Sequence, residues 1–363
     1  MKNVAVFFGG ESIEHDISII TGVLTLNSID KSYKICPIYV DKKGVFYTGE
    51  TLNNPEAYKN LDYKKLKKVT FICGDNKLYE ISGKKLKPLM EIAVAINCMH
   101  GERGEDGCIS SLLKLCKIPL ASPDTFGSSL CINKSLTKIA LKGLDVLYLP
   151  YLTVSDSISA VSAEKLGYPL IVKPCTGGSS IGISEAKDRQ GLEDAVNYAL
   201  KYSDKVIIEP ALENFIEINC ACFKDADGNL IVSECEKPVG KSQVLTFEDK
   251  YLGGLREFPA KIDKEVSDKI KKTTAKIYRE LEFTGVIRID YFVKGDDVYV
   301  NEINTVPGSL AYYLFCKNTV DFKKMLSEIM EFAMVSFNKN SCIKKTFDSG
   351  ILSSIKSKGS KNI

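Results

Sequence analysis

The chain has 363 residues, of which 44% are hydrophobic and 26% are charged, and 49 Lys and Arg against 46 Asp and Glu leave a net charge of +3. This composition is typical of globular proteins, so it excludes wholesale disorder and predicts two or three domains of about 150 residues each. The near balance of charges argues against a protein that binds nucleic acid through its overall charge, and leaves room only for a local basic patch.

The N-terminal residues and the cysteines favour a cytoplasmic protein. The apolar run over residues 4–8 is far shorter than the ~20 residues that cross a membrane, and it lacks the length and cleavage site of a signal peptide. The twelve cysteines include no CxxC pair, and Cys220 and Cys222 share one face of an expected strand. We therefore expect no zinc site, no disulfide framework, and no membrane or nucleic-acid partner; most thiols should fill the core.

Apolar runs alternate with helical patterns along the first ~120 residues, as in α/β proteins. Their carboxyl-terminal ends open into two polar loops, at Gly9-Gly10 and at residues 100–107. This alternation predicts an open, largely parallel sheet, in which ligands gather at the carboxyl ends of the strands. The expected strands cover 3–8, 33–41 and 91–99, and the expected helices cover 17–26 and about 109–116.

The remaining residues continue as a mixture of helices and strands, and the tail after Asn340 is rich in Ser and Lys and is expected to fray. Helix 263–281 is the clearest amphipathic one, because its apolar residues recur near the 3.6-residue period. The other expected helices are 133–143, about 189–202 and about 321–338, and the expected strands are 168–174, 206–212, 215–223, 230–236, 285–293 and 298–304.

A glycine- and serine-rich loop at residues 177–182 directly follows the strand that carries Lys173. Small residues let backbone N–H groups approach phosphate oxygens, and the hydroxyls of Ser179 and Ser180 add further donors. The alternative is a flexible turn without a ligand. The loop is not a Walker A motif, because it lacks the Gly-Lys-Ser/Thr ending, and the Gly9-Gly10 loop lacks dinucleotide-binding spacing.

Two polar segments, residues 288–290 and 301–304, lie on neighbouring expected strands. Alternate residues of a strand share a face, so Arg288 and Asp290 point the same way, as do Glu302 and Asn304. If the strands pair in antiparallel fashion, the four side chains form one cluster whose hard oxygen ligands suit Mg²⁺. The alternative, a solvent-facing row of ion pairs, is disfavoured by the apolar residues between them.

Two further segments carry candidate ligand-binding groups. Lys250 and Tyr251 lie in a loop with Gly253-Gly254 behind them, which suits a segment that closes over a nucleotide, although an exposed linker reads the same way. Both histidines of the chain lie in loops at strand ends, His15 beside Glu14 and His100 at the start of the polar loop. Either histidine taken alone would more often be structural.

Taken together and in order, these segments resemble the D-alanine–D-alanine ligase family of the ATP-grasp superfamily. HG-x-x-GEDG combined with RID and NEINT-x-PG is specific, and the resemblance spans residues 4 to about 310. It implies a three-domain α/β ATP-grasp fold: an N-terminal open parallel domain (1–122), a central domain (123–209) and a C-terminal domain with the metal site and tail (210–363). The matching segments are FFGGESIEHDIS, MHGERGEDGCISSLLKLCKIP, INKSLTK, PLIVKPCTGGSSIG, IIEPALENFIE, EDKYL, RIDYF and NEINTVPG.

The resemblance also implies an activity. Such an enzyme transfers the γ-phosphate of ATP to one D-alanine, and the amine of a second D-alanine attacks the D-alanyl phosphate, which supplies a peptidoglycan precursor in the cytoplasm. It would use ATP and Mg²⁺ (or Mn²⁺) and form a homodimer. One alternative is a sister ligase with a different second substrate, such as D-serine. Another is a catalytically silent, regulatory ATP-binding protein, which the retention of the whole residue set disfavours.

Roles for individual residues follow from the same resemblance. For ATP, they fall on Lys134, Lys173, Ser180, Glu209, Leu212, Glu217 and Lys250, and for the metal on Asp290, Glu302 and Asn304. The catalytic set is Glu14 with Ser179 and Tyr251, together with Arg288 and the backbone N–H of Gly308 at the oxyanion, and substrate contacts fall on His15, His100, Tyr313 and Leu314.

The sequence departs from the family pattern in three places. Residues 309–315 replace a Thr-Ser-x-Ser-like stretch, whose later serine holds the carboxylate of the second substrate in the family, and this puts Tyr313 at about that position. Thr176 stands where a basic residue is common, and Ser110-Ser111 where Gln-Gly is usual. These changes leave the residues for ATP and the metal intact but do not fix the identity of the second amino acid. The Lys-Tyr pair at 250–251 favours an amine nucleophile.

Overall fold

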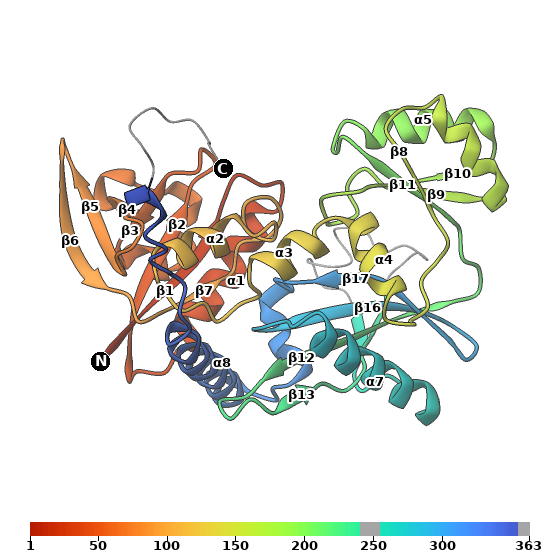
Figure 1. Ribbon diagram of the computed structural model, residues 1–363. Coiled ribbons are helices and arrows are strands. Elements are labelled where there is room, and N and C mark those ends of the chain that lie inside the picture. Colours follow the sequence, from red (N-terminus) through yellow and green to blue (C-terminus); the bar gives the residue numbers. More distant parts are fainter. Residues whose placement is uncertain (240–254, 355–363) are drawn as a thin grey trace.

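A computed structural model describes residues 1–239 and 255–354, and this part of the chain is organised around three large sheets (Figure 1). The first sheet lies at the left of the view, the second at the upper right, and the third between and below them. The segment with Lys250 and Tyr251, predicted to close over a nucleotide, lies outside the described residues.

The first sheet has three parallel strands at its centre, β1 (Lys2–Gly9) between β2 (Tyr33–Val40) and β7 (Val94–Asn97). Residues 4–8 of β1 are fully buried, as expected of a parallel strand with both faces covered. The helices α1 (His15–Ser28) and α2 (Cys108–Leu115) follow β1 and β7. The predicted α/β arrangement is therefore present here.

The sheet continues beyond β2 in an antiparallel direction that the sequence analysis did not predict. The strands β3 (Phe46–Thr48), β4 (Lys67–Phe71), β5 (Lys77–Ser82) and β6 (Lys85–Glu91) follow one another at its edge. Short connections favour antiparallel pairing, and Gly83, at φ +61°, makes the tight turn between β5 and β6. The sheet is therefore mixed, and only its centre is parallel.

The second sheet is antiparallel, in the order β10 (Ser184–Ala186), β9 (Leu170–Pro174), β11 (Val206–Pro210) and β8 (Leu152–Val154). The helix α5 (Arg189–Ala199) buries its apolar face against the sheet. Two helices precede it, α3 (Thr125–Cys131) and α4 (Lys134–Lys142). The short 3₁₀ helices are η1 (Glu50–Asn53), η2 (Pro55–Asn60), η3 (Tyr63–Lys65), η4 (Ser159–Leu166), η5 (Gly308–Leu314) and η6 (Ile351–Ser354).

The third sheet is also antiparallel, in the order β13 (Leu230–Val232), β12 (Ile216–Lys224), β16 (Ile287–Lys294) and β17 (Asp297–Asn304). One face packs in a hydrophobic cluster with α7 (Lys264–Glu280), where Ile287, Ile289 and Tyr291 of β16 are buried. The alternate residues of β16 face the other way, which positions polar groups on the opposite face. A small ribbon of β14 (Lys237–Val239) and β15 (Leu255–Glu257) lies beside this sheet.

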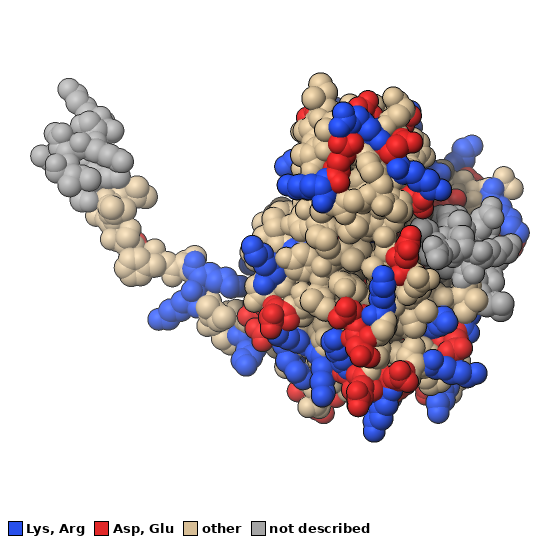
Figure 2. All heavy atoms as spheres, turned by 90° about the vertical axis from the view of Figure 1, so that its right-hand side faces the viewer, with Lys and Arg blue, Asp and Glu red and all other residues tan. Residues whose placement is uncertain are grey.

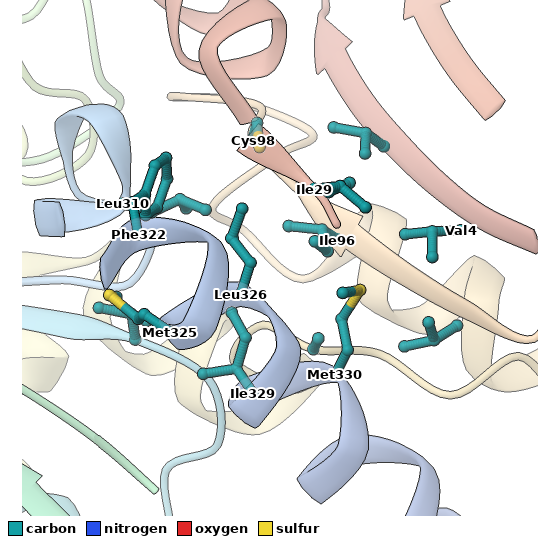
Figure 3. Close-up of a cluster of buried hydrophobic side chains, with 14 of the residues drawn as sticks. Val4, Ile29, Ile96, Cys98, Leu310, Phe322, Met325, Leu326, Ile329 and Met330 are labelled. Atoms are coloured by element: carbon teal, nitrogen blue, oxygen red, sulfur yellow. The ribbon is translucent and has the colours of Figure 1, made fainter. Parts of the chain in front are cut away.

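The last long helix, α8 (Thr319–Ser341), returns to the first sheet (Figure 3). Its Leu326 and Met330 pack in one hydrophobic cluster with Val4 and Ile96 of the first sheet. The C-terminal part of the chain is thus tied to the N-terminal part by buried apolar contacts. The domain boundaries at residues 122 and 209 stay a prediction.

The surface of the protein mixes both signs of charge on the face shown in Figure 2, where Lys and Arg alternate with Asp and Glu. The described residues after α8 extend away from the body, and Phe347 among them is 89% exposed (Figure 2). None of the described helices has the length and apolar character needed to cross a membrane. Eight of the twelve cysteines are buried, in agreement with the expectation that most of them fill the core.

Candidate active site

A cavity of about 700 Å³ lies where the three sheets meet. Its size is that of a typical small-molecule binding site. The first sheet contributes residues of α1 and of the loop 100–107, the second contributes β9, β11 and the loop 177–182, and the third contributes β16 and β17. The carboxyl-terminal ends of β1 and β7 open toward it, as predicted from their polar loops.

The second sheet presents positive charge to the cavity. Lys173 of β9 lies with its Nζ 2.7 Å from Glu209 Oε2, and Lys138 of α4 lies with its Nζ 2.6 Å from Glu209 Oε1. Burial alone would raise the pKa of Glu209, but the two ammonium groups outweigh it and hold that pKa at about 2. Glu209 is therefore ionised and engaged by both lysines, and the sequence analysis did not identify Lys138.

Lys134 adds a second cation beside the phosphate-binding loop predicted from the sequence. Asn133 caps α4, because its side chain accepts hydrogen bonds from the backbone N–H groups of Ser135 and Leu136. This cap fixes the start of the helix and directs Lys134, whose Nζ donates to the carbonyl of Gly177 at 2.7 Å and lies 3.7 Å from Glu302 Oε1. Lys134 thus connects the loop with the third sheet.

The loop 177–182 bends sharply toward the first sheet. Ser179 and Ser180 both adopt left-handed backbone conformations, at φ +54° and +59°. The Ser179 hydroxyl donates a hydrogen bond to the carboxylate of Glu14. The structure therefore brings together two members of the predicted catalytic group, while the third, Tyr251, lies outside the described residues.

The third sheet presents carboxylates to the cavity. Asp290 on β16 stands opposite Glu302 on β17, and Arg288 stands opposite Asn304, as the antiparallel prediction requires. Arg288 holds Asp290 through two hydrogen bonds, from Nε at 2.7 Å and from Nη2 at 2.8 Å, and Asn304 Nδ2 donates to Asp290 at 3.0 Å. The four side chains form the single polar cluster expected from the sequence.

The loop 100–107 supplies two titratable groups, His100 and Glu105, to the cavity wall. His100 is 3% exposed, and its Nε2 lies 2.9 Å from the Thr21 hydroxyl. Burial, and then repulsion by Arg288, lowers the pKa of His100 to about 4, so the imidazole is neutral at pH 7. His15, in contrast, does not line the cavity: its Nδ1 lies 2.6 Å from the carbonyl of Gly10.

Glu105 in the same loop was not assigned a role from the sequence, although it lies within the GEDG motif. It accepts hydrogen bonds from the backbone N–H of Gly101 at 2.8 Å and of Val306 at 3.2 Å, which joins the loop to the end of β17. Burial, and then the negative charge of Glu14, raises the pKa of Glu105 above the range of an ordinary glutamate. The carboxyl group therefore favours its neutral form.

The departure at residues 309–315 places an aromatic ring in the cavity. Tyr313 receives a hydrogen bond from Arg288 Nη1 at 3.1 Å, and the Arg256 guanidinium lies 4.8 Å from the centre of its ring. Arg256, which the sequence analysis did not single out, is also 3.7 Å from Glu236. Leu314 instead packs in a hydrophobic cluster and does not line the cavity.

The other predicted site residues either line the cavity or lie outside the described residues. The cavity lining includes Ser180, Leu212, Glu217 and Gly308 besides the residues already described. Lys250, like Tyr251, lies outside the described residues. A cavity with fixed cations on one wall, hard oxygen ligands on another and a small-residue loop between them is the arrangement expected of an enzyme that uses a nucleoside triphosphate.

Comparison with known families identifies the group within this class. The family model for the D-ala D-ala ligase N-terminus matches residues 3–123, and the model for the D-ala D-ala ligase C-terminus matches residues 147–331. A D-alanine–D-alanine ligase of Thermosipho melanesiensis is 36% identical over 364 residues, which cover 97% of this chain and 98% of the relative. The chain therefore belongs to the D-alanine–D-alanine ligase family, as its motifs predicted.

Solved structures agree with this assignment. The crystal structure of the D-alanine–D-alanine ligase from Helicobacter pylori superposes with a TM-score of 0.75 at 31% identity, covering 96% of this chain and all (100%) of that one. The VanG D-Ala:D-Ser ligase from Enterococcus faecalis superposes with a TM-score of 0.78 at 25% identity, covering 92% and 99% of the two chains. The predicted ATP-grasp fold is confirmed.

Proposed function

We propose that this protein is an ATP-dependent ligase that joins two D-alanine molecules through a D-alanyl phosphate. The observation that carries the proposal is the cavity itself, in which Lys173 of the second sheet and Lys134 of α4 face carboxylates of the third sheet, with the Glu14–Ser179 contact at one end. A triphosphate and a divalent cation require this pairing of charges, and an amino acid with a free ammonium group requires a carboxylate near the transferred phosphate.

The nucleotide lies between the second and third sheets in this proposal. Lys134 and Lys173 contact the phosphates, which Ser180 and the loop 177–182 cover. The residues from Glu209 to Leu212, at the end of β11, border the adenine, and Glu217 on β12 binds the ribose. All of these residues except Gly182, at the end of the loop, line the cavity, which supports the assignment.

A magnesium ion fits the donors of the third sheet. Asp290 and Glu302 face each other across β16 and β17, and Asn304 supplies an amide oxygen beside them. Among the described residues no group of three His, Cys, Asp or Glu could hold a metal alone, so the ion must also rely on phosphate oxygens, as Mg²⁺ commonly does. When bound, it spreads the charge that develops on the transferred phosphoryl group.

The amino-acid substrates occupy the end of the cavity beside the first sheet. Glu14, fixed by Ser179, binds the ammonium of the first D-alanine, and neutral His100 lies beside its carboxylate. Transfer of the γ-phosphate of ATP to this carboxylate gives D-alanyl phosphate and ADP. The amine of the second D-alanine then attacks the carbonyl carbon of D-alanyl phosphate, which forms the peptide bond and releases phosphate and a proton. Arg288 and the backbone N–H of Gly308 stabilise the oxyanion of this step, where one lost donor typically costs ~10²–10³ in rate.

A second candidate replaces the second D-alanine by D-serine. Tyr313 fills the second-substrate region and is held by Arg288, so this region differs from the family pattern. The VanG D-Ala:D-Ser ligase is among the structures that superpose over nearly the whole chain. The shape of this subsite, rather than the ATP site, decides between the two products.

The remaining parts of the proposal concern the whole protein. We place its three domains at residues 1–122, 123–209 and 210–363, since each segment holds one of the three large sheets. A ligase that consumes ATP for peptidoglycan precursors acts in the cytoplasm, and we propose a homodimer. Analytical ultracentrifugation checks the dimer, and a monomer at micromolar concentration contradicts it.

The activity is tested with purified protein, ATP, Mg²⁺ and D-alanine alone. We expect phosphate release and a D-alanyl-D-alanine mass in the products. With an equal mixture of D-alanine and D-serine, the ratio of the two dipeptides separates the main proposal from the second candidate. Absence of phosphate release with every D-amino acid, from protein that binds ATP, would leave only a silent regulatory protein.

A further inference from the structure

A buried cluster of three charges joins Lys173, which we assign to the phosphates, with Glu209, which begins the segment that we assign to the adenine, and with Lys138 behind them. Glu209 stands between Lys138 and Lys173, with Nζ–Oε distances of 2.6 Å and 2.7 Å. The side chains of Lys138 and Glu209 are each 3% exposed, and that of Lys173 is 11% exposed. Lys173 and Glu209 line the cavity, whereas Lys138 does not. Lys138 thus contacts the carboxylate from the side that no ligand reaches.

The surroundings of Lys138 hold it in this position. Its Nζ donates to the carbonyl of Leu149 at 3.3 Å and lies 5.4 Å and 5.6 Å from the ring centres of Tyr148 and Tyr151. Two electron-rich ring faces and a carbonyl favour an ammonium ion there. Burial lowers the pKa of Lys138, and the carboxylate of Glu209 opposes that shift. An ammonium beside an ionised carboxylate stays charged at neutral pH.

The charges of the cluster do not cancel. Two ammonium groups and one carboxylate sum to +1, and the partner that faces Lys173 across the cavity, Asn301, is a neutral amide whose Oδ1 lies 3.3 Å from Nζ. Without Lys138, the carboxylate of Glu209 would neutralise Lys173, and a phosphate approaching this wall would meet a neutral ion pair. With Lys138 present, the wall keeps one positive charge at a fixed place.

We propose that Lys138 is a positioning residue for ATP: it neutralises Glu209 from behind and so leaves the charge of Lys173 for the nucleotide phosphates. Glu209 in turn separates the two ammonium groups and fixes Lys173 at the cavity surface. This inference rests on the proposed function, because it concerns the nucleotide of that reaction. It adds a residue that never touches the nucleotide yet sets the charge that the nucleotide meets.

The test compares a single variant with a double variant in the full-length protein. Lys138→Met reduces the sum of charges to zero, and we expect the Kd of ATP, measured by calorimetry with Mg²⁺, to rise about tenfold or more, which is ~1.4 kcal/mol. Adding Glu209→Gln restores the sum to +1, and we expect the double variant to recover most of the lost affinity. A purely structural role predicts no recovery, since the second substitution removes one more native contact.

The controls separate this inference from folding and from the proposed function. Lys138→Arg keeps the charge, so its ATP affinity should stay close to that of the wild type. Thermal unfolding without nucleotide shows whether each variant is folded; if Lys138→Met is not, the double variant decides, because neutral replacement of a whole buried ion group is commonly tolerated. The inference is overturned if the double variant binds ATP no more tightly than Lys138→Met or, where Lys138→Met is unfolded, if the double variant binds ATP more than tenfold more weakly than the wild type. Wild-type protein that does not bind ATP would overturn the proposed function instead.

Discussion

The two walls of the cavity hold opposite charges by different means. On the second sheet, Lys173 is fixed by a carboxylate that is itself neutralised from behind by Lys138. On the third sheet, Asp290 is fixed by Arg288, a cation in the same face of the same strand. The lysine wall therefore keeps a positive charge and is buried. The carboxylate wall is more exposed: Arg288 balances the charge of Asp290, and Glu302 keeps the wall negative.

This difference explains how one cavity can bind a polyanion and a divalent cation together. A buried cation whose counter-ion is already satisfied attracts phosphate without reorganisation. A carboxylate held by two hydrogen bonds keeps its orientation, yet it can still share its oxygens with a metal ion when phosphate oxygens arrive. The predictions below disturb the carboxylate wall, the loop 100–107 or the second-substrate region, while leaving the lysine wall intact.

The largest effect is expected on the carboxylate wall. Glu302→Gln removes one of the two carboxylates that face the proposed metal, and we expect kcat to fall about a thousandfold, since a metal ion contributes several kcal/mol to phosphoryl transfer. The matched control is Asp297→Asn, at the exposed start of the same strand, which should keep full activity. Phosphate release at saturating ATP and Mg²⁺ measures both, and less than a tenfold loss for Glu302→Gln contradicts the metal site.

The protonation of His100, in the loop 100–107, should make the free energy of unfolding depend on pH. The pKa of His100 is about 4 when folded and about 6.5 when unfolded, so the unfolded state binds the proton first as pH falls. The stability associated with neutral His100 is therefore fully present above pH 6.5. Between pH 6.5 and pH 4 the free energy of unfolding falls by about 3 kcal/mol because of this one group. Urea denaturation should show a smaller loss in His100→Gln over that range.

Glu105, in the same loop, should change stability with pH in the opposite direction to His100. Its folded pKa lies above the ordinary value of 4.5, so the folded state holds the proton longer. The wild type should therefore lose stability relative to Glu105→Gln as pH rises above 4.5 and through the raised folded pKa. A parallel pH dependence of the two proteins would show that Glu105 is ionised in the folded state.

Arg288 is the residue that links the carboxylate wall with the second-substrate region. Arg288→Lys keeps the charge but loses the planar guanidinium fork, whose three nitrogens make two hydrogen bonds to Asp290 and one to Tyr313. We expect kcat to fall about a hundredfold, as for loss of an oxyanion donor. Arg279→Lys, on the exposed side of α7, is the control, and equal kinetics for the two variants would contradict the role of Arg288.

Much of the carboxylate wall could be predicted because strand alternation fixes it. Asp290 and Glu302 follow from two short polar segments, and antiparallel pairing of the strands is enough to bring them together. Lys138 could not be identified in this way, since a lysine in an amphipathic helix normally faces solvent. Its one signal is the i, i+4 spacing from Lys134, which puts both lysines on the same side of α4.

The fold shows the same division between local and long-range information. Helices and buried strands were predicted near their observed positions, because periodicity is a local property. The antiparallel strands from β3 to β6 were not, since most of their residues are half-buried or exposed and lack a clear alternation. Arg256 and Tyr313 are 57 residues apart by their numbers, and only the folded chain stacks one on the other.

The smallest effect is expected where the sequence departs from its family. Tyr313→Phe removes the hydroxyl that accepts a hydrogen bond from Arg288 but keeps the ring beneath Arg256. We expect the KM of the second amino acid to rise about tenfold, in line with one hydrogen bond to a charged group, while the KM of ATP stays unchanged. Tyr312→Phe, whose ring packs 4.7 Å from Phe322, is the matched control. Because the ATP walls are untouched, a change in the KM of ATP would contradict the separation of the two sites, and a changed ratio of D-alanine to D-serine in the product would assign the second subsite to Tyr313.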